Sequence, residues 1–217
     1  MHQGYNRFTR DKIMRLIDIE QKLLTLKQPI LQTRDVSAYL NIPCAQASKI
    51  LDRLAAAGRF VRLMRGKWVT TPQIDPLILP ASLTAPFPSY ISLQTALFYH
   101  AMISQIPHTI YAVSLARTHY YITSFGSISI HHVNPNFFFG FARNNQINIA
   151  TPEKALIDVL YLTSAKSNLF KALPEIEFPK SFNYKKAKAI IKKIPSQRVR
   201  TLVQKRFEKL LSNPNSA

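Results

Sequence analysis

The sequence of 217 residues contains one cysteine, five glycines and 11 acidic residues. The single cysteine, Cys44, excludes an intramolecular disulfide and a zinc site built mainly from cysteines. No GxGxxG or GxxxxGK sequence occurs, which excludes the common Gly-rich phosphate loops. No apolar run approaches the ~18 residues of a membrane span, and the first residues lack the apolar region of a signal peptide. We therefore expect a soluble protein of a reducing compartment that needs no cofactor.

Basic residues, in contrast, are abundant. The 29 Lys and Arg give a net charge of +18 and a pI near 10.2. Residues 1–89 carry 13 basic and 6 acidic side chains, residues 90–177 carry 5 and 4, and residues 178–217 carry 11 and 1. Because solubility does not require two separate basic clusters, this distribution favours a polyanionic partner, with nucleic acid ahead of an anionic membrane.

A proline-rich segment, residues 72–89, divides the chain into an N-terminal domain (1–71) and a C-terminal domain (90–217). Proline removes backbone donors and disfavours helix at the preceding residue, so the segment is expected to be an extended connector. Its apolar side chains favour a strap packed on a domain over a free tether. Its prolines are Pro72, Pro76, Pro80, Pro86 and Pro88.

The N-terminal domain has the pattern of a winged helix-turn-helix. Apolar residues at helical spacing predict helices over about 11–27, 34–40 and 43–57, with Thr33 capping the second and Gly58 ending the third. The sequence 59–70 then changes to a strand, a basic turn at 65–67 and a second strand. Three short helices followed by such a hairpin are typical of this DNA-binding fold.

The third helix turns Ala47, Ile50, Leu51 and Leu54 to one side, so its opposite side is expected to face solvent. Small residues there would let the helix approach base edges, and long polar ones would contact bases or phosphates. Basic side chains of the hairpin at 59–70 would contact the phosphate backbone of the DNA. A winged helix used only for protein contact remains the alternative, and Asp52 on the exposed side argues weakly for it. The predicted DNA-binding residues are Ala45, Gln46, Ser48, Lys49, Arg53, Arg62, Arg65 and Lys67.

The C-terminal domain is expected to be α+β, with a mostly antiparallel sheet flanked by helices. Ser92 is the expected cap of a helix that runs to about Ile103, and Pro152 begins another. The four phenylalanines between 137 and 141 favour a buried strand over a base-stacking cluster. The predicted strands are 109–114, 120–125, 127–133, 137–141 and 146–150.

Three segments follow one another in an order and spacing that resemble a known family. They are YISLQTALFYHAMI, ITSFGSISIHHVNPNFFFGF and INIATPEKALIDVLYL, and ATPEKALIDVLYL is the most specific part. The likeness spans roughly residues 89–165 and is to bacterial AbiEi-type antitoxins of type IV toxin–antitoxin systems, which act in abortive infection and phage defence. The preceding winged helix and connector also fit that family's layout.

The resemblance implies a transcriptional repressor that autoregulates a two-gene operon by binding double-stranded operator DNA at inverted repeats. It also implies an antitoxin that opposes a nucleotidyltransferase-like toxin, without requiring direct contact with it. The protein is therefore expected to be cytoplasmic, associated with the nucleoid and not with a membrane. Oligomeric state stays open, with a monomer that binds cooperatively as one option.

Local chemistry gives little sign of an enzyme or a metal site. Thr151 and Glu153 suit the start of a helix, and Lys154 and Asp158, four residues apart, are expected to pair on its surface. These roles account for both carboxylates without catalysis. Of the six histidines, the adjacent pair at 131 and 132 points to opposite faces of a strand, and the others lack ligand spacing. Cys44 is expected to be a small packed residue.

The last forty residues predict two amphipathic helices, the first capped by Asn183. Apolar stripes at 187, 190, 191 and 194, and at 199, 202, 203, 207, 210 and 211, would dock on the domain. Cationic side chains would remain outside, where they would extend the DNA footprint through phosphate contacts or serve the antitoxin activity. That basic surface comprises Arg117, Lys185, Lys186, Lys188, Lys192, Lys193, Arg198, Arg200, Lys205, Arg206 and Lys209.

Three other functions stay open. The C-terminal domain of a winged-helix repressor could sense a small effector. The winged helix could target an enzyme that acts on nucleic acid or nucleotides. The chain could also be an adaptor that contacts only proteins.

Overall fold

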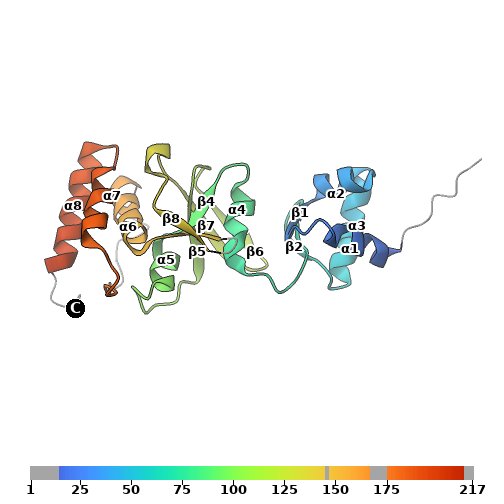
Figure 1. Cartoon of the computed structure of the whole chain (residues 1–217). Coiled ribbons are helices and arrows are strands. Elements are labelled where there is room, and N and C mark those ends of the chain that lie inside the picture. The colour runs from blue at the N-terminus through green and yellow to red at the C-terminus, as the bar shows by residue number, and fades with distance from the viewer. Residues whose placement is uncertain (1–14, 145–146, 167–174, 213–217) are drawn as a thin grey trace, which may run out of the picture. The chain divides into compact units, whose positions relative to one another are not determined.

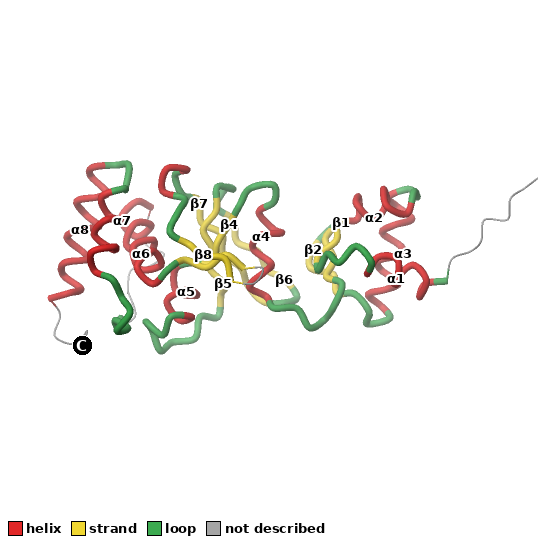
Figure 2. The backbone as a smooth tube through the Cα atoms, viewed as in Figure 1, coloured by secondary structure: helices red, strands yellow, loops and turns green. Residues whose placement is uncertain are grey.

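The computed structural model describes residues 15–144, 147–166 and 175–212. The chain forms two compact units, Met1–Ile74 (unit 1) and Asp75–Ala217 (unit 2). Figures 1 and 2 show the elements of each unit. The structure is mixed α and β, with a small sheet in unit 1 and a larger one in unit 2. The division between the units lies inside the segment that the sequence predicts as a connector.

Unit 1 contains α1 (Leu16–Leu24), α2 (Thr33–Leu40) and α3 (Cys44–Ala56). They correspond to the three predicted helices, although residues 11–14 of the first lie outside the described residues. Each helix buries one apolar side, as helical spacing requires. The core contains Ile19, Leu23, Leu31, Val36, Ala47, Ile50, Leu51, Leu54, Phe60 and Trp68.

A three-stranded sheet completes unit 1. The predicted hairpin is present as β2 (Val61–Met64) and β3 (Lys67–Val69). The sequence did not predict β1 (Ile30–Gln32), which pairs antiparallel with β3 and gives the order β1-β3-β2. The prediction that the Thr33 side chain caps α2 is wrong. Thr33 is the first residue of the helix, and its Oγ1 accepts a hydrogen bond from the indole of Trp68 at 3.0 Å. This bond ties the start of α2 to β3.

Unit 2 is built on a six-stranded sheet with the order β6-β7-β5-β4-β9-β8. Three neighbouring pairs are antiparallel, whereas β5–β7 and β4–β9 are parallel. The sheet is therefore more mixed than expected. Its strands are β4 (Ser89–Ile91), β5 (Thr109–Ser114), β6 (His119–Thr123), β7 (Gly126–His132), β8 (Phe141–Asn144) and β9 (Ile147–Ala150).

Two predicted extended segments of unit 2 differ from the structure. Residues 72–89 are not extended throughout, because they contain the 3₁₀ helix η1 (Pro76–Ile78), the helix α4 (Leu79–Thr84) and the first residue of β4. Pro80 is tolerated because it occupies the first turn of α4. The predicted strand 137–141 is instead the 3₁₀ helix η2 (Pro135–Phe137) and a loop, and β8 begins only at Phe141.

Helices cover both sides of this sheet. In Figure 1, α5 (Leu93–Tyr99) and α6 (Pro152–Lys166) lie on one side and α4 on the other. Both α7 (Tyr184–Lys192) and α8 (Gln197–Ser212) pack on α6. The predicted stripe of α7 is buried, as are Val203 and Phe207 of α8. Leu202 and Leu211, also predicted to face inward, are exposed instead.

Candidate nucleic-acid interface

The outer side of α3 presents the predicted base-contacting residues together. Ala45, Gln46, Lys49 and Arg53 are exposed, and Ser48 is half-buried. Their positions follow from the four residues of α3 that enter the core, all of which are buried as predicted. Small side chains near the start of the helix leave its backbone accessible, and longer polar ones follow one and two turns later. This surface has the chemistry to contact an anionic polymer closely.

The carboxylate that argued against DNA binding has a cationic neighbour. Asp52 Oδ1 lies 3.8 Å from Nη1 of Arg62 on β2. The Arg62 guanidinium also lies 5.5 Å from the centroid of the Trp68 ring, in cation–π geometry. Arg62 therefore offsets a negative charge on α3, which makes it a less direct phosphate ligand than the sequence suggested.

The turn between β2 and β3 is held against the start of α2. The backbone N–H of Thr33 donates to the carbonyl of Gly66 at 3.0 Å, and Gly66 has a φ of +76° that favours glycine. Arg65 is exposed and Lys67 half-buried. Burial, and then the nearby Arg34 guanidinium, lower the pKa of Lys67 from 10.5. Arg34 is therefore a cation of this site that sequence spacing did not reveal.

In unit 2, the lysines of α7 divide into two rows. Lys185, Lys188 and Lys192 follow i, i+3, i+7 spacing and are exposed. Lys186 and Lys193, seven residues apart, are also exposed, but each contacts the domain. Lys186 Nζ lies 2.9 Å from Glu153 Oε2, and Lys193 Nζ lies 4.8 Å from the Phe139 ring centroid. All five lysines are therefore exposed, and two of them also contact the rest of unit 2.

On α8, Arg198, Lys205 and Lys209 are exposed at i, i+7, i+11 spacing, with Arg206 beside them. Arg200 points elsewhere, because its Nε and Nη2 donate to the carbonyl of Ile194 at 3.1 and 2.8 Å. We call the outward set the cationic surface. It comprises Lys185, Lys188, Lys192, Arg198, Lys205, Arg206 and Lys209.

Arg117 does not belong to this surface. It is exposed in the connection between β5 and β6, and not on α7 or α8. The sequence could not separate it from the other cations, because charge alone does not give position.

Two side chains of α6 are fully buried where the sequence predicted a surface pair. Lys154 Nζ donates to Asp158 Oδ1 at 2.6 Å and to the carbonyl of Phe137 at 3.0 Å. Asp158 Oδ2 accepts from the Tyr90 hydroxyl at 2.9 Å and from the Ser92 hydroxyl at 2.8 Å. Ser92 thus binds Asp158 rather than capping α5.

The environment of this cluster is apolar and aromatic. Lys154 Nζ lies 3.4 Å from the Phe137 ring centroid. Burial lowers the pKa of Lys154 from 10.5, against the opposing influence of Asp158, and burial followed by Asp158 raises the pKa of Tyr90 well above 10.0. Every group named here has a partner, so the cluster joins α6 to β4 and to η2 rather than exposing a reactive group.

Glu153 also joins elements of unit 2. Its Oε1 accepts from the backbone N–H of Asn183 at 3.1 Å, next to the ion pair with Lys186. Burial raises the pKa of Glu153, but hydrogen bonds from Lys186, Thr151 and Asn183 outweigh it and hold the net pKa below 4.5. Asn183 caps α7 as predicted, since its Oδ1 accepts from Lys186 N at 3.0 Å.

In residues 15–144, 147–166 and 175–212, no three His, Cys, Asp or Glu side chains gather closely enough to hold an ion. His131 is buried and bonded to the Ser129 hydroxyl at 2.9 Å, whereas His132 contacts the carbonyls of Leu115 and Ala116. Cys44 is exposed rather than packed, contrary to the prediction.

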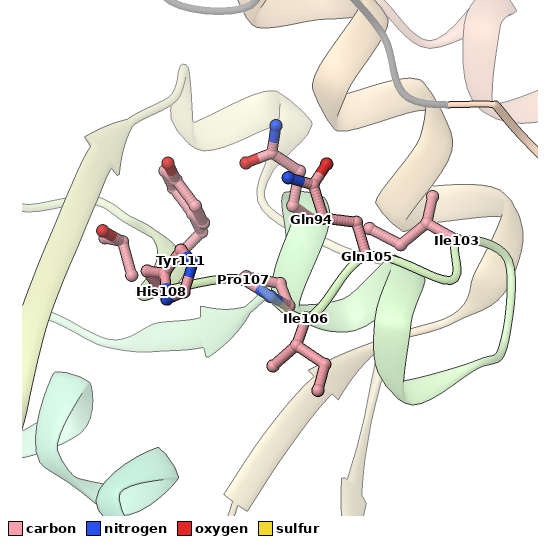
Figure 3. Close-up of a pocket in the computed structure, with 8 residues that line it drawn as sticks. Gln94, Ile103, Gln105, Ile106, Pro107, His108 and Tyr111 are labelled. Atoms are coloured by element: carbon pink, nitrogen blue, oxygen red, sulfur yellow. The ribbon is translucent and has the colours of Figure 1, made fainter.

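A hollow of about 230 Å³ lies beside β5 (Figure 3). The amides of Gln94 and Gln105 and the ring of Tyr111 are at one side, and Ile103, Ile106 and Pro107 form apolar walls. His108 and Thr109 complete the lining, which includes no Asp, Glu, Lys or Arg. Its size and neutral polar groups suit a small uncharged molecule better than a phosphate.

The chain matches no model of a known protein family, and a search of curated proteins finds none with significant sequence similarity. Over the described part of the chain, every helix is too short or too polar to cross a lipid bilayer.

Proposed function

We propose that the protein is a transcriptional repressor that binds double-stranded operator DNA through unit 1, in the manner of a winged helix-turn-helix. The observation that carries the proposal is the exposed polar side of α3, with Gln46, Lys49 and Arg53, in a unit that also presents a basic hairpin turn. In this assignment α3 enters the major groove, and Lys49 and Gln46 contact base edges. Arg53, Arg65 and Lys67 contact phosphates, joined by Arg34.

In unit 2, the cationic surface is proposed to add sequence-independent phosphate contacts. The segment 178–217 has 11 basic residues and one acidic residue, Glu208, which accepts a hydrogen bond from Gln204 on its own helix. The positive charges of the surface are thus largely uncompensated within these helices. A polyanion would relieve their mutual repulsion and release condensed counterions.

The resemblance of residues 89–165 extends the proposal to an antitoxin. The protein would repress its own two-gene operon at inverted repeats and oppose a nucleotidyltransferase-like toxin without needing to bind it. It would act as a cytoplasmic, nucleoid-associated protein of phage defence and not as an enzyme. Co-expression tests this part, because the chain should restore the growth of cells that express the toxin encoded beside it.

Competition binding tests the DNA assignment with two lysine variants. Lys49→Ala should reduce preference for the duplex upstream of its own gene over random duplex, by roughly 1–3 kcal/mol. Lys192→Ala should weaken both duplexes alike. Lys186→Ala is the matched control on α7, since Glu153 already holds that ammonium. Equal losses for Lys49→Ala and Lys192→Ala on both duplexes would contradict the assignment.

Salt dependence is the second readout of the same experiment. If ~6–8 phosphates are neutralised, the logarithm of affinity should fall with the logarithm of salt at a slope of about −5 to −7. Lys192→Ala should make the slope less steep by about 1, as expected for one lost phosphate contact. An affinity that hardly changes with salt would exclude an electrostatic DNA interface. The absence of binding to any duplex would favour the alternative of an adaptor that contacts only proteins.

The hollow beside β5 favours a second candidate, a repressor whose unit 2 senses a small neutral effector. Operator affinity that changes with added metabolites, and loses this response in Gln94→Leu, would support it. A toxin-like neighbouring gene with growth rescue would instead favour the antitoxin.

A further inference from the structure

The strand β6 (His119–Thr123) is one edge of the unit 2 sheet and lacks the features that usually protect an edge. Its sequence, HYYIT, contains no formal charge, proline or glycine. Tyr120 is 54% exposed and Ile122 is 82% exposed. The opposite edge, β8, carries Arg143. Exposed edge strands with apolar side chains and no charge are templates for pairing with another strand.

The register shows which backbone groups of β6 point outward. Thr123 opposes Gly126 across a two-residue turn, and Tyr121 opposes Ile128. On β7, His132 N donates to Thr118 Oγ1 before β6, whereas Val133 N donates to Ser114 O on β5. Because backbone groups alternate in direction along a strand, residues 119, 121 and 123 bond to β7. The N–H and C=O groups of Tyr120 and Ile122 therefore point away from the sheet.

We infer that β6 is a self-association surface, on which a second copy of the chain pairs antiparallel about a two-fold axis at Tyr121. In this register Tyr121 faces its own counterpart, and Tyr120 of each copy faces Ile122 of the other. Tyr120 of each copy then exchanges two backbone hydrogen bonds with Ile122 of the other copy. The two such pairs give four new backbone hydrogen bonds. The two Tyr–Ile pairs lie on one face, and aromatic pairs with β-branched residues are favourable across strands.

Charge favours a second copy over nucleic acid at this edge. The chain carries +18, so two copies repel wherever their basic surfaces approach. Residues 90–177 carry 5 basic and 4 acidic side chains, so this region avoids most of that repulsion. The nearest cation in sequence, Arg117, would lie opposite Phe125 of the other copy and not opposite its own counterpart. A nucleic-acid surface would instead be expected to present cations along the strand.

This inference does not depend on the proposed function, and the full chain without DNA tests it. Sedimentation velocity at about 10 to 500 µM, in salt high enough to screen repulsion, should show growth from monomer toward dimer. Ile122→Lys should weaken association at least about tenfold, because a lysine on an edge opposes pairing. Ile17→Lys is the matched control, since that isoleucine is 51% exposed but lies on α1, outside β6, and this variant should associate normally.

Cross-linking tests the register. In a Cys44→Ser background, Tyr121→Cys should form an intermolecular disulfide under mild oxidation, since directly opposed residues of a non-hydrogen-bonded pair are close. Thr123→Cys, two positions along on the same face, should cross-link at least about tenfold more slowly, because it faces His119. A chain that stays monomeric at every concentration, association unchanged by Ile122→Lys, or equal cross-linking at both positions would overturn the inference. If the chain stayed monomeric, β6 would be covered by a different partner or by solvent, and not by a second copy.

Discussion

Replacing Lys154 by methionine tests whether the buried cluster of α6 holds unit 2 together. The change keeps the length of the side chain but removes its positive charge, and Asp158 then remains fully buried with only the Tyr90 and Ser92 hydroxyls as partners. Removing one member of a buried ion pair typically costs about 3–5 kcal/mol of unfolding free energy. For a domain near 150 residues this lowers the melting temperature by roughly 6–20 °C.

The single tryptophan lets each unit be followed separately. Trp68 is buried in unit 1, so its fluorescence reports the unfolding of that unit. Far-UV circular dichroism reports the helices of both units. We expect Lys154→Met to move the part of the circular dichroism transition that belongs to unit 2 and to leave the tryptophan transition in place.

Two further variants make the result specific. Lys188→Met is the same substitution at an exposed position of α7 and should change the unfolding free energy by less than about 0.5 kcal/mol. Adding Asp158→Asn to Lys154→Met removes the orphaned charge but keeps an oxygen that accepts from Tyr90 and Ser92. The double variant should recover a large part of the loss. A double variant no more stable than Lys154→Met, or a single variant as stable as the parent, would refute the reasoning.

Two other substitutions in unit 2 have defined outcomes. Because the pKa of Glu153 is lowered in the fold, its stabilisation is present above pH 4.5 and is lost as the pH falls through the folded value. Glu153→Gln should therefore be less stable than the parent near neutrality, and the gap in melting temperature should close on acidification; a pH-independent gap would contradict this. Gly140→Ala should cost more than Gly126→Ala by thermal unfolding. Both have positive φ, but only the Cβ at 140 would meet the Lys154 side chain, at 3.0 Å. Equal costs would show that the side chain moves aside freely.

Periodicity predicted the elements that are long enough to display it. The three helices of unit 1, the hairpin after Gly58 and the stripe of α7 follow from apolar spacing and from turn residues. The strands β1 and β4 have three residues each, too few for alternation to be recognised, and, unlike the equally short β3, neither follows a predicted hairpin turn. Both are defined by tertiary pairing, with β3 in one case and with β5 and β9 in the other.

The candidate site was predictable in composition but not in detail. Outward positions on α3 follow from its buried side, whereas the contact of Arg62 with Asp52 and the proximity of Arg34 to Lys67 arise from packing. The pair Lys154–Asp158 matched a surface pattern because i, i+4 spacing carries no information on burial. The sequence did contain a signal that this pair is buried. Residues 152–166 are apolar nearly all round the helix, so little of its surface is left to face solvent with charged side chains. Its buried apolar residues are Ala155, Leu156, Ile157, Val159, Leu160 and Leu162.

The place of β4 within its sheet determines how the two halves of the protein can be separated. This strand is the first of unit 2 along the chain, yet it lies between β5 and β9, and residues 76–84 pack beside it. A fragment that begins at residue 90 would lose Ser89 and η1 with α4, and would open the middle of the sheet. A fragment that begins at Asp75 keeps every partner of that strand. Only the longer piece is suited to complementation experiments in cells, since failure of the shorter one would report misfolding instead of missing activity.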